Sequence, residues 1–280
     1  MLLHMTMNEH SKNPFPSPQV MGILNVTPDS FSDGGFFQNP AAALSQARKI
    51  AKKGADIIDV GGQSTRPGAV PVSVQQELDR VIPVIRAIHA QIPIRISIDT
   101  SRPQVMREAV AAGARIINDV RALREEGAMQ AARELDVPVC LMHMQGEPET
   151  MQVAPDYRDV VQEVRDFLLA RITACQAQGI DRDRLWIDPG FGFGKTLAHN
   201  LELLSHLDRF VDIGVPVLAG LSRKSMIGAI LNKKSVKRRL SGSIAAALIA
   251  AGKGVAIVRV HDVGPTVDAL KVWKATSSPE

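Results

Sequence analysis

Short apolar runs alternate with segments of helical periodicity along nearly the whole chain. The runs are rich in β-branched and other apolar residues, as buried strands are, and they span residues 19–26, 56–62, 95–101, 115–120, 138–144, 185–190, 216–222 and 255–261. The helical candidates span residues 40–53, 74–90, 103–112, 127–135, 160–178, 197–209, 241–251 and 266–276. Strands separated by helices predict parallel pairing through crossover connections, in a sheet covered on both faces.

Eight strand–helix units in a chain of 280 residues predict an α/β fold, a single-domain (β/α)8 barrel of the TIM type. The alternative is an open doubly wound sheet, but the pattern GxGxxG that usually follows its first strand does not occur after residues 19–26. The barrel is expected to occupy residues 19–277, and Ser101 is expected to cap the helix that starts at residue 103. Residues 1–18 lack the pattern of a signal peptide and are expected to form a flexible leader.

The bulk composition narrows the class of protein. With 45% apolar and 22% charged residues, and with no apolar stretch of about 20 residues, the chain is expected to be globular and to lack a membrane span. The net charge of +4 is mild, and the basic cluster in residues 233–239 is interpreted as a solvated loop, so no nucleic-acid partner is expected. Cys140 and Cys175 are too few for a disulfide framework, which favours a cytoplasmic protein with reduced thiols.

Polar residues stand at or near the carboxyl ends of the predicted strands, where the active site of a (β/α)8 barrel lies. They are Asn25, Asp99, Asn118, Asp119, His143, Asp188, Ser222, Lys224, Arg259 and His261. Taken singly, an Asp or Asn here is usually a turn former or cap, and His143 is best explained as a structural histidine. Asp119 and Asp262 are interpreted as caps or ion-pair partners at the rim. The convergence of the whole set on one end of the barrel favours a binding site.

The residue types indicate the kind of ligand. Arg259 and His261 alternate along one strand, so they face the same side and suit a phosphate or diphosphate. Asn25 could supply an oxygen to Mg²⁺, which prefers few protein ligands together with waters and substrate phosphates. A carboxylate at Asp188 suits the paired donors of a guanidine-like heterocycle, and Lys224 suits a ring carbonyl or nitrogen. The predicted ligand is a flat polar heterocycle that carries a phosphate.

Nine stretches, taken in order, resemble the dihydropteroate synthase family of pterin-binding barrels. They are GILNVTPDSFSDGG (22–35), DVGGQSTRPGA (59–69), SIDTS (97–101), INDV (117–120), LMHMQG (141–146), DPGFGFGK (188–195), SRKSMIG (222–228), RLSGS (239–243) and RVHDV (259–263). The resemblance implies a transferase of folate biosynthesis that condenses 7,8-dihydropterin-6-ylmethyl diphosphate with 4-aminobenzoate. It also implies a dissociative, carbocation-like mechanism, a homodimer, and sulfonamides as competitors.

The resemblance implies a role for each matching residue. The pterin would be held by Thr65, Asp99, Asn118, Asp188 and Lys224. The diphosphate would be held by Asn25, Arg259 and His261, with Mg²⁺ bound at Asn25. The aminobenzoate would meet Arg66, Pro67, Phe191 and Ser222. Asp33, Asp99 and Lys224 are the expected catalytic residues, and residues 27–39 are expected to cover the site and bring Asp33 to the reacting carbon.

One departure and three alternatives accompany this assignment. The family usually has glutamate where this chain has Gln63, which puts any salt bridge from that position in doubt. A methyltransferase that acts on a corrinoid is disfavoured, because it would have no use for a diphosphate site at Arg259 and His261. A non-catalytic pterin-binding paralogue would show degraded loops. An aldolase that forms a Schiff base on Lys224 would be trapped by borohydride.

Overall fold

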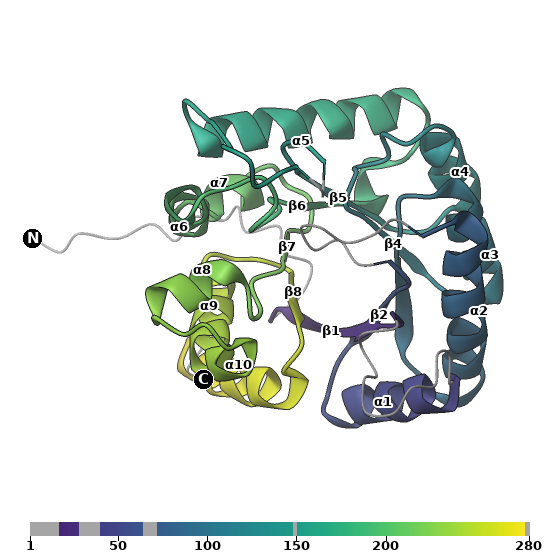
Figure 1. Cartoon of the computed structure of the whole chain (residues 1–280). Coiled ribbons are helices and arrows are strands. Elements are labelled where there is room, and N and C mark those ends of the chain that lie inside the picture. Colours follow the sequence, from purple (N-terminus) through teal and green to yellow (C-terminus); the bar gives the residue numbers. More distant parts are fainter. Residues whose placement is uncertain (1–16, 28–39, 64–71, 148–149, 278–280) are drawn as a thin grey trace, which may run out of the picture.

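The computed structural model forms a ring of parallel strands surrounded by helices (Figure 1). It describes residues 17–27, 40–63, 72–147 and 150–277. The strands are β1 (Gln19–Asn25), β2 (Ile57–Gly61), β3 (Arg95–Asp99), β4 (Ile116–Asp119), β5 (Val139–Met142), β6 (Leu185–Asp188), β7 (Leu218–Ala219) and β8 (Ile257–Val260). Their order in the sheet is β6-β5-β4-β3-β2-β1-β8-β7, and a parallel bridge between Ile187 and Val217 joins the two ends. The predicted (β/α)8 barrel is therefore confirmed.

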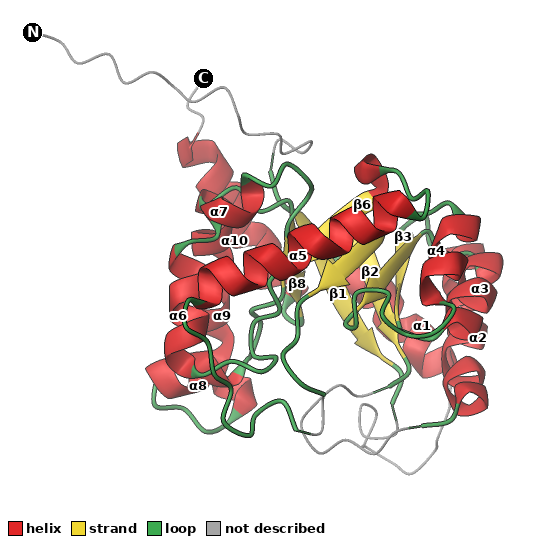
Figure 2. Ribbon diagram, turned by 90° about the horizontal axis from the view of Figure 1, so that it is seen from above, coloured by secondary structure: helices red, strands yellow, loops and turns green. Residues whose placement is uncertain are grey.

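The helices surround the ring of strands (Figure 1). They are α1 (Pro40–Lys52), α2 (Val74–Gln91), α3 (Pro103–Ala112), α4 (Ala128–Leu135), α5 (Val160–Ala177), α6 (Leu197–Ser205), α7 (Asp208–Val211), α8 (Ser225–Ile230), α9 (Leu240–Gly252) and α10 (Val263–Ser277). In Figure 2, α5 crosses in front of the strands, with α6 to α10 on the left and α1 to α4 on the right. Two short 3₁₀ helices span Arg182–Arg184 and Val236–Arg239. None of the helices in the described part of the chain is long and apolar enough to cross a membrane.

Side-chain caps explain where several helices begin. Ser73 starts α2, because its hydroxyl accepts from the Gln76 amide at 3.1 Å while the Gln76 side chain accepts from the Ser73 amide at 2.8 Å. The prediction that Ser101 caps α3 is wrong. The helix begins after Arg102, with a proline as its first residue, and the Ser101 hydroxyl donates to Asp119 instead.

The predicted helix over residues 197–209 is in fact two helices. α6 ends at Ser205, and His206, with φ −113° and ψ 27°, leaves the helical conformation. Leu207 and Phe210 are fully buried and continue the apolar spacing of the buried Leu203 and Leu204 of α6. This spacing explains why the sequence predicts one helix, although the chain leaves the helical conformation at His206.

The interior of the barrel changes from apolar to polar along the strands. Its amino-terminal layer is a separate apolar cluster made of Met21, Ile57, Ile116, Cys140, Trp186, Leu218, Ala256 and Ile257. Two residues further along the strands, where the side chains point inward again, stand Asp59, Asn118, Asp188 and Arg259. The apolar layer closes one end of the barrel, and the polar layer faces the other.

Candidate active site

Arg259 on β8 binds residues of two other strands directly and is linked to a third strand through Asp59. Its Nε donates to Asp59 Oδ2 on β2 over 2.6 Å, and its Nη2 donates to Asp99 Oδ2 on β3 over 2.7 Å. Asp59 Oδ2 also accepts from Asn118 Nδ2 on β4 over 3.1 Å. Three predicted site residues, Asp99, Asn118 and Arg259, are thus brought together around a fully buried carboxylate that the sequence analysis did not identify.

The charged groups in this cluster shift one another's pKa values. Burial raises the pKa of Asp99 from 3.8 to about 7, because the ionised carboxylate loses its water. Arg259 opposes this rise, whereas the neighbouring carboxylate of Asp59 adds to it. Asp99 can therefore both accept and donate a proton near neutral pH, which suits a group that must match donors and acceptors on a heterocycle.

Asp188 and Lys224 form the opposite side of the polar layer. Asp188 Oδ1 accepts from the Gly190 amide over 2.7 Å, and a Cβ on Gly220 would lie 3.9 Å from Asp188 Oδ2, so the small residue leaves room beside that oxygen. Burial raises the pKa of Asp188, and the nearby Lys224 ammonium opposes the rise. Burial likewise lowers the pKa of Lys224 to about 8, against the attraction of Asp188.

Lys224 is held by the loop that follows β6. Its Nζ donates to the Phe191 carbonyl and lies 4.4 Å from the centre of the Phe193 ring. The Phe191 side chain is fully buried in the main core, and its backbone carbonyl accepts the hydrogen bond from Lys224. Phe193, two residues later, is the aromatic ring beside Lys224, and it also packs against the small cluster that contains Met142.

A buried lysine holds this loop in shape. Lys195 is 3% exposed, and its Nζ lies 2.9 Å from His143 Nδ1, 3.0 Å from the Gly190 carbonyl and 3.0 Å from the Phe193 carbonyl. Burial, aided by Lys195, lowers the pKa of His143 to about 2, so the ring is neutral and its Nδ1 accepts. His143 is thus a structural histidine, as predicted.

The same loop depends on glycine. Gly190, Gly192 and Gly194 have φ of 72°, 78° and 60°, in the left-handed region that favours residues without a side chain. A Cβ on Gly190 would lie 1.9 Å from the His143 carbonyl oxygen, so the two loops touch backbone to backbone.

Ser222 and His261 lie together where β7 and β8 end. The Ser222 hydroxyl accepts from the His261 amide over 3.2 Å and lies 3.1 Å from His261 Nδ1. Asn25, at the end of β1, and Asp99 face the space above Gly61, since a Cβ there would lie 3.6 Å from Asn25 Oδ1 and 3.8 Å from Asp99 Oδ2.

Two rim carboxylates have the structural roles that were predicted. Asp119 accepts from the Ser101 hydroxyl and from the Arg121 and Leu123 amides. Asp262 accepts two hydrogen bonds from Arg223, at 2.8 and 2.5 Å, and thereby ties the end of β8 to the loop that carries Lys224.

Four predicted site residues lie outside the described residues: Asp33, Thr65, Arg66 and Pro67. Residues 1–16 of the predicted leader also lie outside the described residues.

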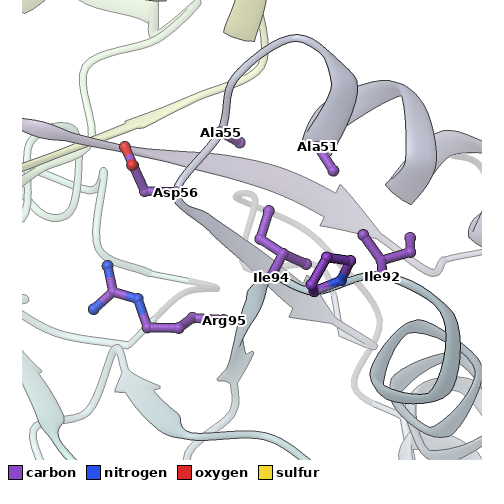
Figure 3. A pocket seen from close by; sticks show the side chains of 7 residues that line it. Ala51, Ala55, Asp56, Ile92, Ile94 and Arg95 are labelled. Atoms are coloured by element: carbon purple, nitrogen blue, oxygen red, sulfur yellow. The ribbon is translucent and has the colours of Figure 1, made fainter.

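A surface cavity of about 490 Å³ is lined by Ala51, Ala55, Asp56, Ile92, Pro93, Ile94 and Arg95 (Figure 3). Because Asp56 precedes β2 and Arg95 begins β3, this cavity lies at the amino-terminal end of the barrel, away from the polar layer.

A resident metal would find few protein ligands at this site. Within the described part of the chain, no group of three or more His, Cys, Asp or Glu residues could hold an ion. The oxygens that face the space above Gly61, Asn25 Oδ1 and Asp99 Oδ2, fit a hard cation that takes most of its ligands from water and phosphate.

Comparison with known proteins agrees with this geometry. Residues 21–261 match the model of the family described as pterin binding enzyme. The chain is 55% identical to dihydropteroate synthase of Escherichia coli (strain K12) over 261 residues, which cover 93% of this chain and 92% of that protein.

Two solved structures have the same fold. The dihydropteroate synthase of Xanthomonas albilineans with 4-aminobenzoic acid is 55% identical, with a TM-score of 0.90 and 94% of each chain covered. That of Yersinia pestis in a sulfonamide drug complex is 51% identical, with a TM-score of 0.89 and coverage of 93% of this chain and 94% of that one. The chain belongs to the pterin-binding enzyme family, among the dihydropteroate synthases.

Proposed function

We propose that this protein condenses 7,8-dihydropterin-6-ylmethyl diphosphate with 4-aminobenzoate, giving 7,8-dihydropteroate and pyrophosphate. The observation that carries the proposal is the polar layer, in which Asn118, Asp188 and Arg259 stand on three strands. Asp99 at the end of β3 is hydrogen-bonded to Arg259, and the Lys224 ammonium lies near Asp188. Membership of the family supports the same reaction.

Each described residue has a task in recognising the pterin. Asp188 accepts hydrogen bonds from the guanidine-like edge, and its buried position strengthens them because water does not compete. Lys224 donates to a ring oxygen or nitrogen. Asp99 and Asn118 match the remaining donors and acceptors, and Thr65 is proposed to join them.

The reaction begins when the bond between the pterin methylene carbon and the diphosphate oxygen breaks. The electron pair leaves with pyrophosphate, whose developing charge Arg259 and His261 stabilise. The carbocation is delocalised into the pterin, and the arylamine nitrogen attacks it with its lone pair and then releases a proton to water. Asp33 is proposed to stabilise the cation, while the protein positions the two reactants.

Mg²⁺ is the proposed cofactor. Asn25 would hold it together with oxygens of the substrate diphosphate, and when bound the ion neutralises negative charge on the leaving group. The support is the position of Asn25 Oδ1 above Gly61, next to the carboxylate of Asp99.

The second substrate is proposed to bind between Ser222 and the loop after β6, with Arg66 and Pro67 completing its pocket. Phe191 remains a prediction for this pocket. Phe193 is only partly buried and lies next to Lys224, and we propose it as the aromatic contact. Sulfonamides are proposed to compete for this pocket, as the Yersinia pestis complex suggests.

A homodimer is also proposed. Large apolar side chains are exposed on neighbouring elements of one side of the barrel, from α8 to α9: Ile230 at 53%, Val236 at 46%, Leu240 at 39% and Ile249 at 50%. Both cysteines are free and buried, which suits the reducing cytoplasm proposed as its location. Light scattering tests the dimer, and Ile249→Glu should shift it toward monomer.

The proposed reaction is tested by measuring pyrophosphate release. Release should require both substrates and should be lost in Asp188→Ala, whereas Asp268→Asn on the exposed face of α10 should behave as wild type. The aldolase alternative finds support in the lowered pKa of Lys224, about 8. Trapping of a carbonyl substrate by borohydride, without pyrophosphate release from the two proposed substrates, would favour the aldolase.

A further inference from the structure

Asp59 is the least expected group in the polar layer. It lies in the middle of β2, is fully buried and carries a carboxylate where the layer below is apolar. A buried carboxylate is unfavourable unless it is paired and hydrogen-bonded. Asp59 Oδ2 accepts hydrogen bonds from Arg259 Nε and Asn118 Nδ2, but Oδ1 has no hydrogen-bond partner among the described residues. Packing alone would be served better by an apolar side chain.

The two partners of Asp59 belong to different halves of the site. Arg259 is the proposed contact for the diphosphate and Asn118 for the pterin. A single oxygen therefore fixes both side chains, at 2.6 Å and 3.1 Å. We infer that Asp59 is a positioning residue, which orients Arg259 and Asn118 so that one substrate can be held at both ends; this inference rests on the proposed function.

The arrangement of donors shows how Asp59 acts. A guanidinium has five N–H groups. In this structure Arg259 uses Nε for Asp59 and one N–H of Nη2 for Asp99, which leaves Nη1 and the second N–H of Nη2 for an anion. Because Asp59 takes Nε, Asp99 receives only one bond from Arg259 and keeps its other oxygen for the pterin.

Without the Asp59 carboxylate, Arg259 would be attracted by one ionised neighbour instead of two. Arg259 and Asp99 could then pair through two parallel hydrogen bonds, as arginine and carboxylate commonly do. That pairing would withdraw donors from the diphosphate and an acceptor from the pterin. Asp59 thus prevents Arg259 and Asp99 from using all their hydrogen-bonding atoms on each other.

The test is Asp59→Asn, which keeps the size of the side chain. We expect the KM for the pterin diphosphate and the inhibition constant of pyrophosphate to rise by about 10-fold to 100-fold. The KM for 4-aminobenzoate should change by less than about threefold. Ser97→Ala is the matched control, because Ser97 pairs with Asp59 in the β2–β3 register and is equally buried, yet contacts neither Arg259 nor Asn118 in the described hydrogen bonds.

A double-mutant cycle separates positioning from a general loss of structure. If Asp59 acts through Arg259, Asp59→Asn should weaken pyrophosphate binding strongly in wild type but by less than about twofold in Arg259→Ala. Additive losses in the cycle would refute the inference. If Asp59→Asn does not fold, the double variant Asp59→Asn/Arg259→Gln is tested, because it removes both charges. Recovered folding in the double variant supports the pairing of Asp59 with Arg259. A double variant that also fails to fold overturns it, because Asp59 would then be needed by the barrel itself.

The comparison of ligands gives a readout that simple packing would not move. A general loss of structure would raise the KM for both substrates, whereas loss of positioning raises the KM for the pterin diphosphate alone. If the wild-type protein releases no pyrophosphate from the two substrates, the proposed function fails instead, and pyrophosphate binding in the double-mutant cycle still tests the pairing of Asp59 with Arg259.

Discussion

Replacing Lys195 with methionine is expected to destabilise the folded protein strongly, although the two side chains have similar length. The three N–H groups of the ammonium have three acceptors at 2.9, 3.0 and 3.0 Å: His143 Nδ1 and the carbonyls of Gly190 and Phe193. The site is nearly closed to water, since Lys195 is 3% exposed. Methionine would fill the space but would leave His143 Nδ1 and the Phe193 carbonyl without a donor, while the Gly190 carbonyl would keep only the Phe193 amide, at 3.1 Å.

The magnitude follows from these three bonds. A hydrogen bond to a charged group contributes about 1.5–3 kcal/mol to stability. Part of the stability lost with these bonds is recovered, because a buried ammonium is itself unfavourable, as the lowered pKa of Lys195 indicates. We therefore expect a loss of about 3–5 kcal/mol in the free energy of unfolding. In a chain of this size that corresponds to a fall in Tm of roughly 6–20 °C.

Urea unfolding followed by circular dichroism measures this loss. The control is Lys253→Met, because Lys253 forms an ion pair of 3.1 Å with Asp208 on the surface, where both side chains are exposed. Such a pair contributes about 0–1 kcal/mol. If Lys195→Met were no less stable than Lys253→Met, the three contacts would not hold the loop, and the account of how Phe193 and Lys224 are placed would have to be abandoned.

Three further expectations concern the site. Asp188→Ala should weaken pterin binding by at least about tenfold in calorimetry, because paired donors lose a buried acceptor, and an affinity within about threefold of wild type would exclude that role. Arg259→Ala should weaken binding of the diphosphate substrate much more than binding of a pterin without diphosphate; equal losses would count against it. Burial raises the pKa of Asp99 from 3.8 to about 7, so the folded protein holds more protons than the unfolded chain between these values. Stability should therefore decrease as the pH rises from about 4 to 7, and urea titrations of Asp99→Asn should show a shallower decrease.

Much of the site could be predicted because strand ends in a parallel barrel converge. Once the strands were placed, the positions of Asn25, Asp99 and Asp188 followed from topology alone. In the structure Arg259 binds Asp99 directly and is linked to Asn118 through Asp59. The same rule did not reveal Asp59, which stands two residues before the end of its strand. Its signals in the sequence were an acidic residue inside an apolar run, at an inward-facing position, and its place at the start of the stretch 59–69.

Phe191 and Phe193 show a different limit. In a strand or helix, spacing tells which side chains share a face, but these two residues lie in a loop whose three glycines have positive φ. No period applies there, so residues two apart can point to unrelated places: one ring is fully buried in the core and the other lies beside Lys224.

Lys195 shows why the course of that loop could not be read from the sequence. Its partner His143 is 52 residues away and belongs to the preceding strand–helix unit. Either residue alone, at the end of a strand or after a glycine, has the appearance of a ligand-binding group. Only when β5 and β6 are paired do the lysine and histidine meet and satisfy each other. The pairing of strands thus decides which polar residues at the mouth of the barrel are used by the fold and which remain available to a substrate.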